Sequence, residues 1–291
     1  MTKTTYKNIC IVAVVAVGLS ACGGGGSSDA NKTSSAYDGD VPAQPVNETI
    51  VHNGTLYGSV VSPKTGRVWL DRNLGAQRVC TSATDELCFG DLYQFGRGYD
   101  GHQDRHSGVI RIRETSLEDT GPNFVAQYRA TDGDWYDYSL EIPNLSAVSQ
   151  RDKGAYYRES KERLEQLRKA YVLSVTKRVA IWRRTDGSSI CPVGYQVPTT
   201  EEVVAEDLRN RGTGSHPKSD YGYTKSVLKL PIAGSRNSAG DILGVGENTW
   251  LALATQNSTN GGWGAYLLVE KAGVGGVTMN SAYPVRCIRA K

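Results

Sequence analysis

The sequence predicts an α+β domain in which short antiparallel strands dominate, and two patterns lead to this fold class. Residues 226 to 289 alternate short apolar runs with turns rich in Gly and Asn, which is typical of an antiparallel sheet. Thr199 precedes Glu202 at the spacing of a helix-capping box, and residues 149 to 178 carry apolar side chains at helical spacing. The composition agrees, because 39% hydrophobic residues with 33 Gly and 16 Tyr indicate a loop-rich globular protein.

The N-terminal residues have the composition of an export signal. Lys3 and Lys7 precede an apolar run at residues 9–17, far below the ~20 residues that a membrane-spanning helix needs. The following Leu19-Ser20-Ala21-Cys22 resembles the lipobox of bacterial lipoproteins, which implies cleavage before Cys22 and its acylation, for example with palmitate. We therefore expect residues 1–21 to be a lipoprotein signal peptide. An ordinary secretory signal with a chance Cys is the alternative.

Residues 22–46 are expected to form a flexible tether, because they begin with a Gly/Ser-rich run and remain polar. Gly23 after the lipidated Cys resembles lipoproteins sent to the outer membrane, so the membrane is an expected partner through the lipid anchor. The domain at residues 47–291 would then be displayed in the cell envelope, facing either the periplasm or the medium. Nucleic acid is not an expected partner, since 33 basic residues nearly balance 30 acidic ones.

Four cysteines remain once Cys10 and Cys22 are assigned to the leader and the anchor. Cys80, Cys88, Cys191 and Cys287 are an even number in an oxidising compartment, where disulfides persist. Three pairings are possible. We favour Cys80–Cys88, which closes a local loop, with Cys191–Cys287, which joins two strand-like segments. Zinc is the alternative, but neither pair has the close spacing and histidine partners of zinc ligands.

Local patterns predict the elements of the domain in order. Strands are expected at residues 49–51 and 56–61 around an Asn53-Gly54 hairpin turn, followed by a third at residues 67–70. Residues 92–97 suit a short strand or a helix end. A long amphipathic helix is expected at residues 149–178, ahead of an apolar segment at 179–182. The last strands are expected at residues 226–232, 248–255, 264–269, 276–280 and 283–289.

Several blocks together resemble the Fibrobacter succinogenes major paralogous domain family, in the order in which that family has them. They are Trp69–Gly75, Leu92–Arg97, Asp100–His102, Cys191–Thr199, Leu228–Arg236 and Val285–Arg289. The family is similar to the C-type-lectin-like fold that formylglycine-generating enzymes share. The resemblance implies short twisted strands, two helices and long irregular loops. It covers the chain from about residue 50, except a middle at about residues 103–180, which we expect to be an insertion.

A glycan or a surface protein is the expected ligand. Aromatic rings stack on apolar sugar faces, while Asp, Asn and Arg bind hydroxyls. The candidate ligand-binding residues are Trp135, Tyr136, Tyr221, Tyr223, Trp263, Arg72 and Arg236. The alternative is that most of these aromatic residues fill a core poor in Phe, with both arginines buried and charge-paired. A structural envelope component without a ligand is the other reading of the chain.

No cofactor is expected, although two clusters are weak metal candidates. Asp100, His102, Asp104 and His106 lie close together in sequence, but neighbouring glycines favour a solvated loop over a metal site. Glu247 and Asn248 could offer oxygens to Ca²⁺, yet the Glu-Pro-Asn and Trp-Asn-Asp signatures of calcium-dependent lectins are missing from the sequence. An enzyme of the formylglycine-generating type would need a reactive cysteine couple, and Cys80 and Cys88 are better used structurally. We therefore do not expect an enzyme.

Overall fold

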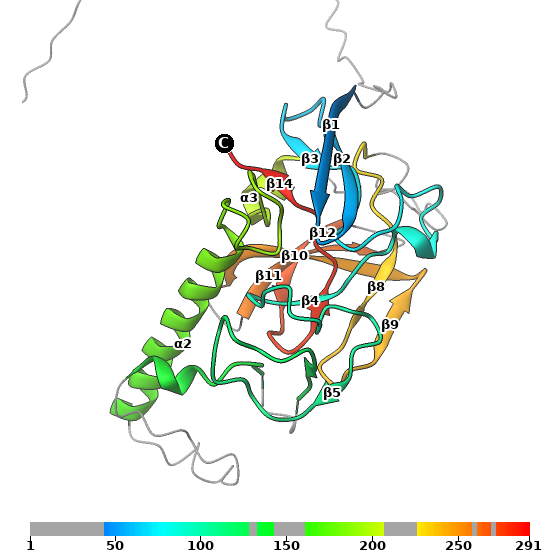
Figure 1. Cartoon of the computed structure of the whole chain (residues 1–291). Helices are drawn as coiled ribbons and strands as arrows, with labels where there is room; N and C mark the ends of the chain where they lie inside the picture. The colour runs from blue at the N-terminus through cyan, green and yellow to red at the C-terminus, as the bar shows by residue number, and fades with distance from the viewer. Residues whose placement is uncertain (1–43, 128–132, 143–160, 207–225, 258–260, 269–271) are drawn as a thin grey trace, which may run out of the picture. The chain divides into compact units, whose positions relative to one another are not determined.

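The computed structural model describes residues 44–127, 133–142, 161–206, 226–257, 261–268 and 272–291, all within one compact unit, Asp40–Lys291 (Figure 1). The fold is mixed α and β, as the sequence predicted, and strands dominate. The described helices are α2 (Lys161–Trp182), α3 (Thr200–Ala205) and the short 3₁₀ turns η1 (Glu86–Cys88) and η2 (Tyr138–Glu141). No helix among the described residues is long and apolar enough to cross a bilayer.

The first sheet has five strands in the order β1-β2-β3-β14-β7, and all of its pairs are antiparallel. Its strands are β1 (Gln44–His52), β2 (Thr55–Val61), β3 (Val68–Leu70), β14 (Ile288–Arg289) and β7 (Tyr195–Gln196). The expected hairpin is confirmed, because Asn53 and Gly54 both have positive φ, 47° and 75°, as its tight turn requires. β1 begins at Gln44, so the expected tether, residues 22–46, overlaps a strand.

The second sheet has seven strands in the order β12-β11-β10-β8-β13-β4, with β9 paired to β8. Its strands are β12 (Ala272–Val277), β11 (Gly261–Leu268), β10 (Asn248–Asn257), β8 (Ala233–Arg236), β13 (Ala282–Tyr283), β4 (Tyr93–Gln94) and β9 (Ile242–Val245). Only β10 and β8 pair in parallel among these, and β5 (Val109–Ile110) and β6 (Phe124–Val125) form a separate parallel pair. The expected strand at residues 226–232 is wrong. Leu228 and Leu230 are buried there, but their segment is irregular. The Leu228 carbonyl accepts a hydrogen bond from the Arg286 guanidinium instead of from a neighbouring strand.

Helix α2 is the long helix of the domain and differs from its predicted bounds at the C-terminal end. It runs through Trp182, because Ile181 and Trp182 continue its buried face instead of starting a separate segment. The expected residues 149–160 lie outside the described part of the chain. Gly96 lets the helix approach closely, since a Cβ at that position would lie 2.3 Å from the Cβ of Arg178. The side chain of Arg178 therefore enters the core.

The expected insertion at about residues 103–180 is not a separate body in its described parts. Trp135 and Val175 belong to the same buried cluster as Leu70, Tyr93 and Val285, which come from the flanking segments. A second buried cluster contains Trp69 and Ile288 from the first sheet, Leu253 from the second sheet and Val203 from α3. The middle of the chain therefore contributes to the main core.

Two local predictions near α3 are confirmed. The Thr199 hydroxyl accepts from the Glu202 backbone N–H, and the Glu202 carboxylate accepts from the Thr199 N–H, which completes the capping box. Both expected disulfides are present, Cys80–Cys88 and Cys191–Cys287. The second ties the segment before β7 to the residue before β14, two neighbouring strands of the first sheet.

Candidate functional site

Trp135 and Tyr136 were predicted to face a ligand, and this prediction is wrong because both are buried. The Trp135 indole N–H donates to the Phe95 carbonyl at 2.8 Å. Its ring lies 5.5 Å from the guanidinium carbon of Arg97 and 5.5 Å from that of Arg178. Two cations and a backbone acceptor thus hold this ring inside the protein, where no sugar can stack on it.

The two candidate arginines also have protein partners. Arg72 forms a two-point ion pair with Asp71, with both N···O distances at 2.9 Å. Arg236 is buried 4.4 Å from the Phe124 ring centroid and donates to the backbone carbonyls of Ser107 and Gly240. Arg72 therefore remains partly accessible, whereas Arg236 serves the interior.

The side chains of the three remaining candidates are not among those that the structure describes. Tyr221 and Tyr223 lie outside the described residues. Trp263 lies in β11, where its backbone is in register with Leu253 of β10 and Gly276 of β12.

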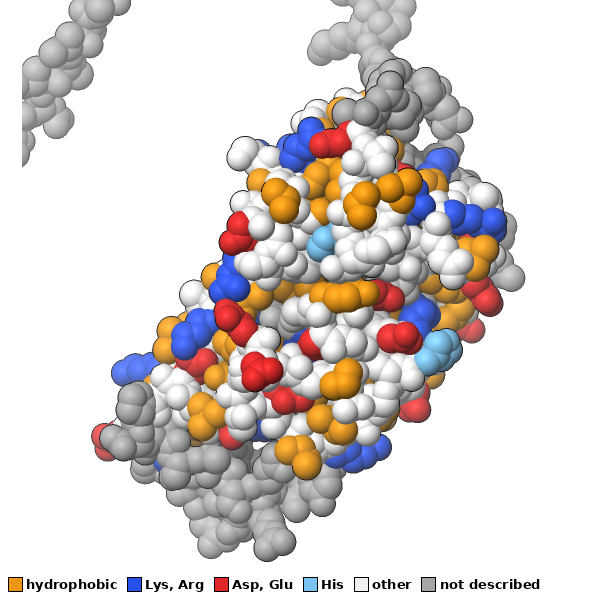
Figure 2. Space-filling view, in the orientation of Figure 1, with side chains coloured by type: hydrophobic (Ala, Val, Ile, Leu, Met, Phe, Trp, Pro, Cys, Tyr) orange, Lys and Arg blue, Asp and Glu red, His pale blue; other side chains and the backbone are white. Residues whose placement is uncertain are grey.

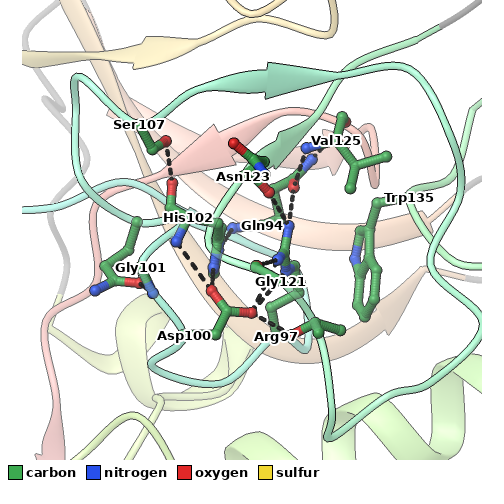
Figure 3. Close-up of polar contacts among 12 residues, drawn as sticks. Gln94, Arg97, Asp100, Gly101, His102, Ser107, Gly121, Asn123, Val125 and Trp135 are labelled. Atoms are coloured by element: carbon green, nitrogen blue, oxygen red, sulfur yellow. Dashed lines mark hydrogen bonds and ion pairs between the residues drawn. The ribbon is translucent and has the colours of Figure 1, made fainter.

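The loop expected around His102 is present but only partly solvated, because His102 itself is buried and both of its ring nitrogens are hydrogen-bonded. His102 is fully buried, its Nδ1 bonds to the Asp100 carboxylate, and its Nε2 accepts from the Gln94 N–H at 3.0 Å (Figure 3). A backbone N–H must donate, so Nδ1 carries the proton and the ring is neutral. Burial lowers the pKa of His102 below its ordinary value. Asp104 and His106 are exposed beside it.

The second metal candidate lies at the turn between β9 and β10. Gly246 has φ 75° there, Glu247 is exposed and Asn248 is partly buried. Within the described ranges, no group of three or more His, Cys, Asp or Glu side chains could hold a metal ion.

The structure brings together a different set of polar residues, here called the Asp91 site. Its members come from β2, from the loop after β3 and from β4 with its flanking segments: Tyr57, Arg72, Asp91, Tyr93, Tyr99 and Arg105. The Tyr93 hydroxyl lies 3.4 Å from Asp91 Oδ2, its only hydrogen-bond partner among the described residues. Gly75 packs directly on the carboxyl group, where a Cβ would lie 2.3–2.6 Å from its atoms.

The hydroxyl groups around Asp91 differ in exposure. Tyr57 and Tyr93 are buried, and the Gly75 N–H donates to the Tyr57 hydroxyl at 2.8 Å. Tyr99 is 50% exposed, and Arg72 lies 6.0 Å from the Tyr57 ring centroid. The site thus offers a partly buried carboxyl, an accessible aromatic ring and a partly buried arginine that is ion-paired with Asp71.

Burial raises the pKa of Asp91 to about 6, and the charge of Asp104 adds to the increase, while the Tyr93 hydroxyl and Arg105 oppose it. Burial and the nearby Asp91 also hold the pKa of Tyr93 well above its ordinary value. Near neutral pH the Asp91 carboxyl is therefore a poorly solvated anion that can gain a hydrogen bond from a ligand hydroxyl. No thiol adds to this chemistry from the described cysteines, since all four are in disulfides.

The sequence analysis identified Arg72 but missed Asp91, Tyr93 and Tyr99. A signal was present, because Asp91 and Tyr93 flank the apolar Leu92, and alternate residues of an extended segment point to the same side. The partial burial of Asp91 could not be read from this pattern, since it depends on Gly75 and Tyr57 from another part of the chain.

Comparison with protein-family models, curated proteins and solved structures finds no match to this chain. The function is therefore inferred from the chemistry of its residues. In the Asp91 site the carboxyl group is poorly solvated, and the accessible Tyr99 interacts electrostatically with the neighbouring Tyr93.

The charge of Asp91 should make stability depend on pH. Its pKa is about 6 in the folded protein, above the ~3.9 of an unfolded Asp, so its contribution to stability is fully present below pH ~4 and is lost as pH rises through 6. Asp91→Asn should therefore be more stable than the wild type at pH 7.5, by about 1–2 kcal/mol after allowance for partial solvent screening. Urea unfolding at several pH values measures the difference, which should vanish near pH 4. Glu201→Gln, at an exposed position on α3, is the control, and a gain for Asp91→Asn that does not change with pH would contradict the assignment.

Proposed function

We propose that this chain is a lipid-anchored cell-envelope protein whose C-type-lectin-like domain binds a glycan at the Asp91 site. The leader with Cys22 and the Gly/Ser-rich tether support the anchored location. Short strands, long irregular connections, and the two α-helices and two disulfides among the described residues support the fold proposal. Figure 2 shows acidic and basic side chains interspersed on the face in view, and the 33 basic residues of the chain nearly balance its 30 acidic ones, which favours a neutral ligand over a nucleic acid.

One observation carries the ligand proposal: the Asp91 carboxylate is kept partly buried with a single weak hydrogen bond. An arrangement that costs stability is characteristic of binding and catalytic sites, where a group is held ready for a partner. Glycan hydroxyls would donate to the carboxylate and accept from Arg72. Tyr99, which is half exposed and interacts electrostatically with Tyr93, would stack on the apolar face of a sugar ring.

Two other functions lead to different expectations at the same site. A surface-protein ligand would use Tyr99 and Arg72 as anchors, because Tyr and Arg are enriched at the centres of protein interfaces. A structural envelope component would need no ligand, and substitutions at Asp91 would then change stability alone.

A glycan array probed with the detergent-solubilised full chain, in Ca²⁺ and in EDTA, tests the proposal. We expect binding in both conditions, and at least a tenfold loss of affinity in Asp91→Asn and in Tyr99→Ala, because each removes a direct contact. The matched controls are Glu201→Gln and Val172→Ala, at exposed positions on α3 and α2. No array signal would favour the structural role, and equal binding by all variants would show that the ligand binds at another site.

The lipid anchor is tested separately by membrane fractionation. Retention of a Cys22→Ser variant in the membrane fraction would contradict the anchor.

A further inference from the structure

The guanidinium group of Arg97 is enclosed by oxygen atoms from strand β4 and from two loops. It donates to Asp100 Oδ2 from Nε at 3.1 Å and from Nη2 at 2.9 Å. It also donates to Gln94 Oε1 at 2.8 Å, to the Asn123 carbonyl at 2.9 Å and to the Gly121 carbonyl at 2.7 Å. Figure 3 shows these groups converging on the Arg97 side chain. We call the four acceptor atoms the oxygen cage.

The cage matches its occupant fully. A guanidinium carries five N–H donors, and each of the five hydrogen bonds above uses one of them. The Arg97 side chain has no solvent exposure, and the Trp135 ring lies 5.5 Å from its guanidinium carbon. No donor is left for water, so the cation is held entirely by protein groups.

The cage atoms are themselves fixed by other contacts. Asp100 Oδ1 accepts from the His102 N–H and bonds to His102 Nδ1, while Asp100 Oδ2 accepts from the Thr120 hydroxyl. The Gln94 amide N–H groups donate to the carbonyls of Val125 and Asn280, at 2.9 and 2.8 Å, so its oxygen must face Arg97. The oxygens would therefore stay close together without the arginine.

Carboxylate, side-chain amide and backbone carbonyl oxygens are the ligand types with which proteins surround bound cations. Four such oxygens packed together in a buried place repel one another unless a positive charge lies between them. We propose that the oxygen cage is a cation-binding site that the chain fills with its own Arg97 guanidinium. The loops around Asp100 and Asn123 are then joined without a metal ion, and the cage of an Arg97→Ala variant takes up free guanidinium ion.

Chemical rescue tests this proposal in the full chain. Arg97→Ala should have a lowered melting temperature that rises by roughly 2–4 °C in 50 mM guanidinium chloride, far below denaturing concentrations. Urea, the neutral analogue of guanidinium, and NaCl at the same concentration should give no rise. The wild type and Leu92→Ala should not gain, because Leu92→Ala opens an apolar cavity in a different buried cluster. If guanidinium rescues Arg97→Ala no better than urea does, the proposal is wrong.

A second pair of variants decides the matter if Arg97→Ala does not fold. Arg97→Lys keeps the positive charge in the cage, whereas Arg97→Met has a similar length without the charge. We expect Arg97→Lys to melt at the higher temperature, because its ammonium group can still bind Asp100 Oδ2 and the carbonyls. An Arg97→Met variant at least as stable as Arg97→Lys would show that the cage needs only volume, and would overturn the proposal.

Discussion

Arg178→Met should lower the free energy of unfolding by about 3–5 kcal/mol, because it leaves a buried carboxylate without its partner. The Nη1 and Nη2 groups of Arg178 donate to the two carboxylate oxygens of Asp134 at 2.7 Å each, and the two side chains are 0% and 4% exposed. The same substitution removes the cation from the face of the Trp135 ring. Urea unfolding at pH 7, followed by far-UV circular dichroism, measures the loss.

Two further variants separate the buried ion pair from a general effect of losing an arginine. Arg184→Met breaks an ion pair with Glu118 near the end of the same helix, but these side chains are 38% and 64% exposed. It should cost less than about 1 kcal/mol. Replacing both partners, Arg178→Met with Asp134→Leu, should recover much of the stability, since no unpaired charge then stays buried. A single Arg178→Met variant as stable as Arg184→Met would contradict the role given to this pair.

Removal of the Cys191–Cys287 disulfide should have an effect of similar size. The cysteines are 96 residues apart, and opening a loop of that length costs about 4.7 kcal/mol when the entropy of the unfolded chain is the main term. The double variant Cys191→Ala, Cys287→Ala should therefore unfold at a much lower urea concentration. Alanine is the suitable replacement because both positions are fully buried and a serine hydroxyl would lack a partner.

The second disulfide is the internal control for this prediction. Cys80 and Cys88 are only 8 residues apart, so their loop should contribute less than ~3 kcal/mol. The corresponding alanine double variant should thus lose clearly less stability than the first one. Equal losses, or a larger loss for the short loop, would show that native packing outweighs loop entropy in this domain.

Features encoded by neighbouring residues could be predicted from the sequence. The Asn53-Gly54 turn, the Thr199–Glu202 capping box and the mixed α and β composition depend on local rules, and the structure confirms each. The disulfide pairing was also predicted correctly, because Cys191 and Cys287 both border strand-like segments. Their strands β7 and β14 are neighbours in the first sheet.

Features that depend on distant partners were predicted poorly. Trp135 and Tyr136 were candidates because aromatic rings can stack on sugars, yet Arg178, more than forty residues away, pairs with the neighbouring Asp134 and contacts the Trp135 ring inside the core. His102 has polar neighbours in sequence, but Gln94 and Asp100 satisfy both of its ring nitrogens. The Asp91 site was missed for the same reason, since its burial comes from residues outside its own segment.

Strand β14 has a consequence for how the protein is made. It lies between β3 and β7, so the first sheet lacks this inner strand, and one edge of β3 stays unpaired, until residues 288 and 289 are present. About 200 residues separate β3 from β14, so in a chain that folds after export, as proposed above, this side of β3 stays open until the C-terminal residues have crossed the membrane. During that time the open side of β3 can pair with another newly exported chain. Factors that shield strand edges should therefore raise the yield of this protein more than that of a domain whose last strand is peripheral.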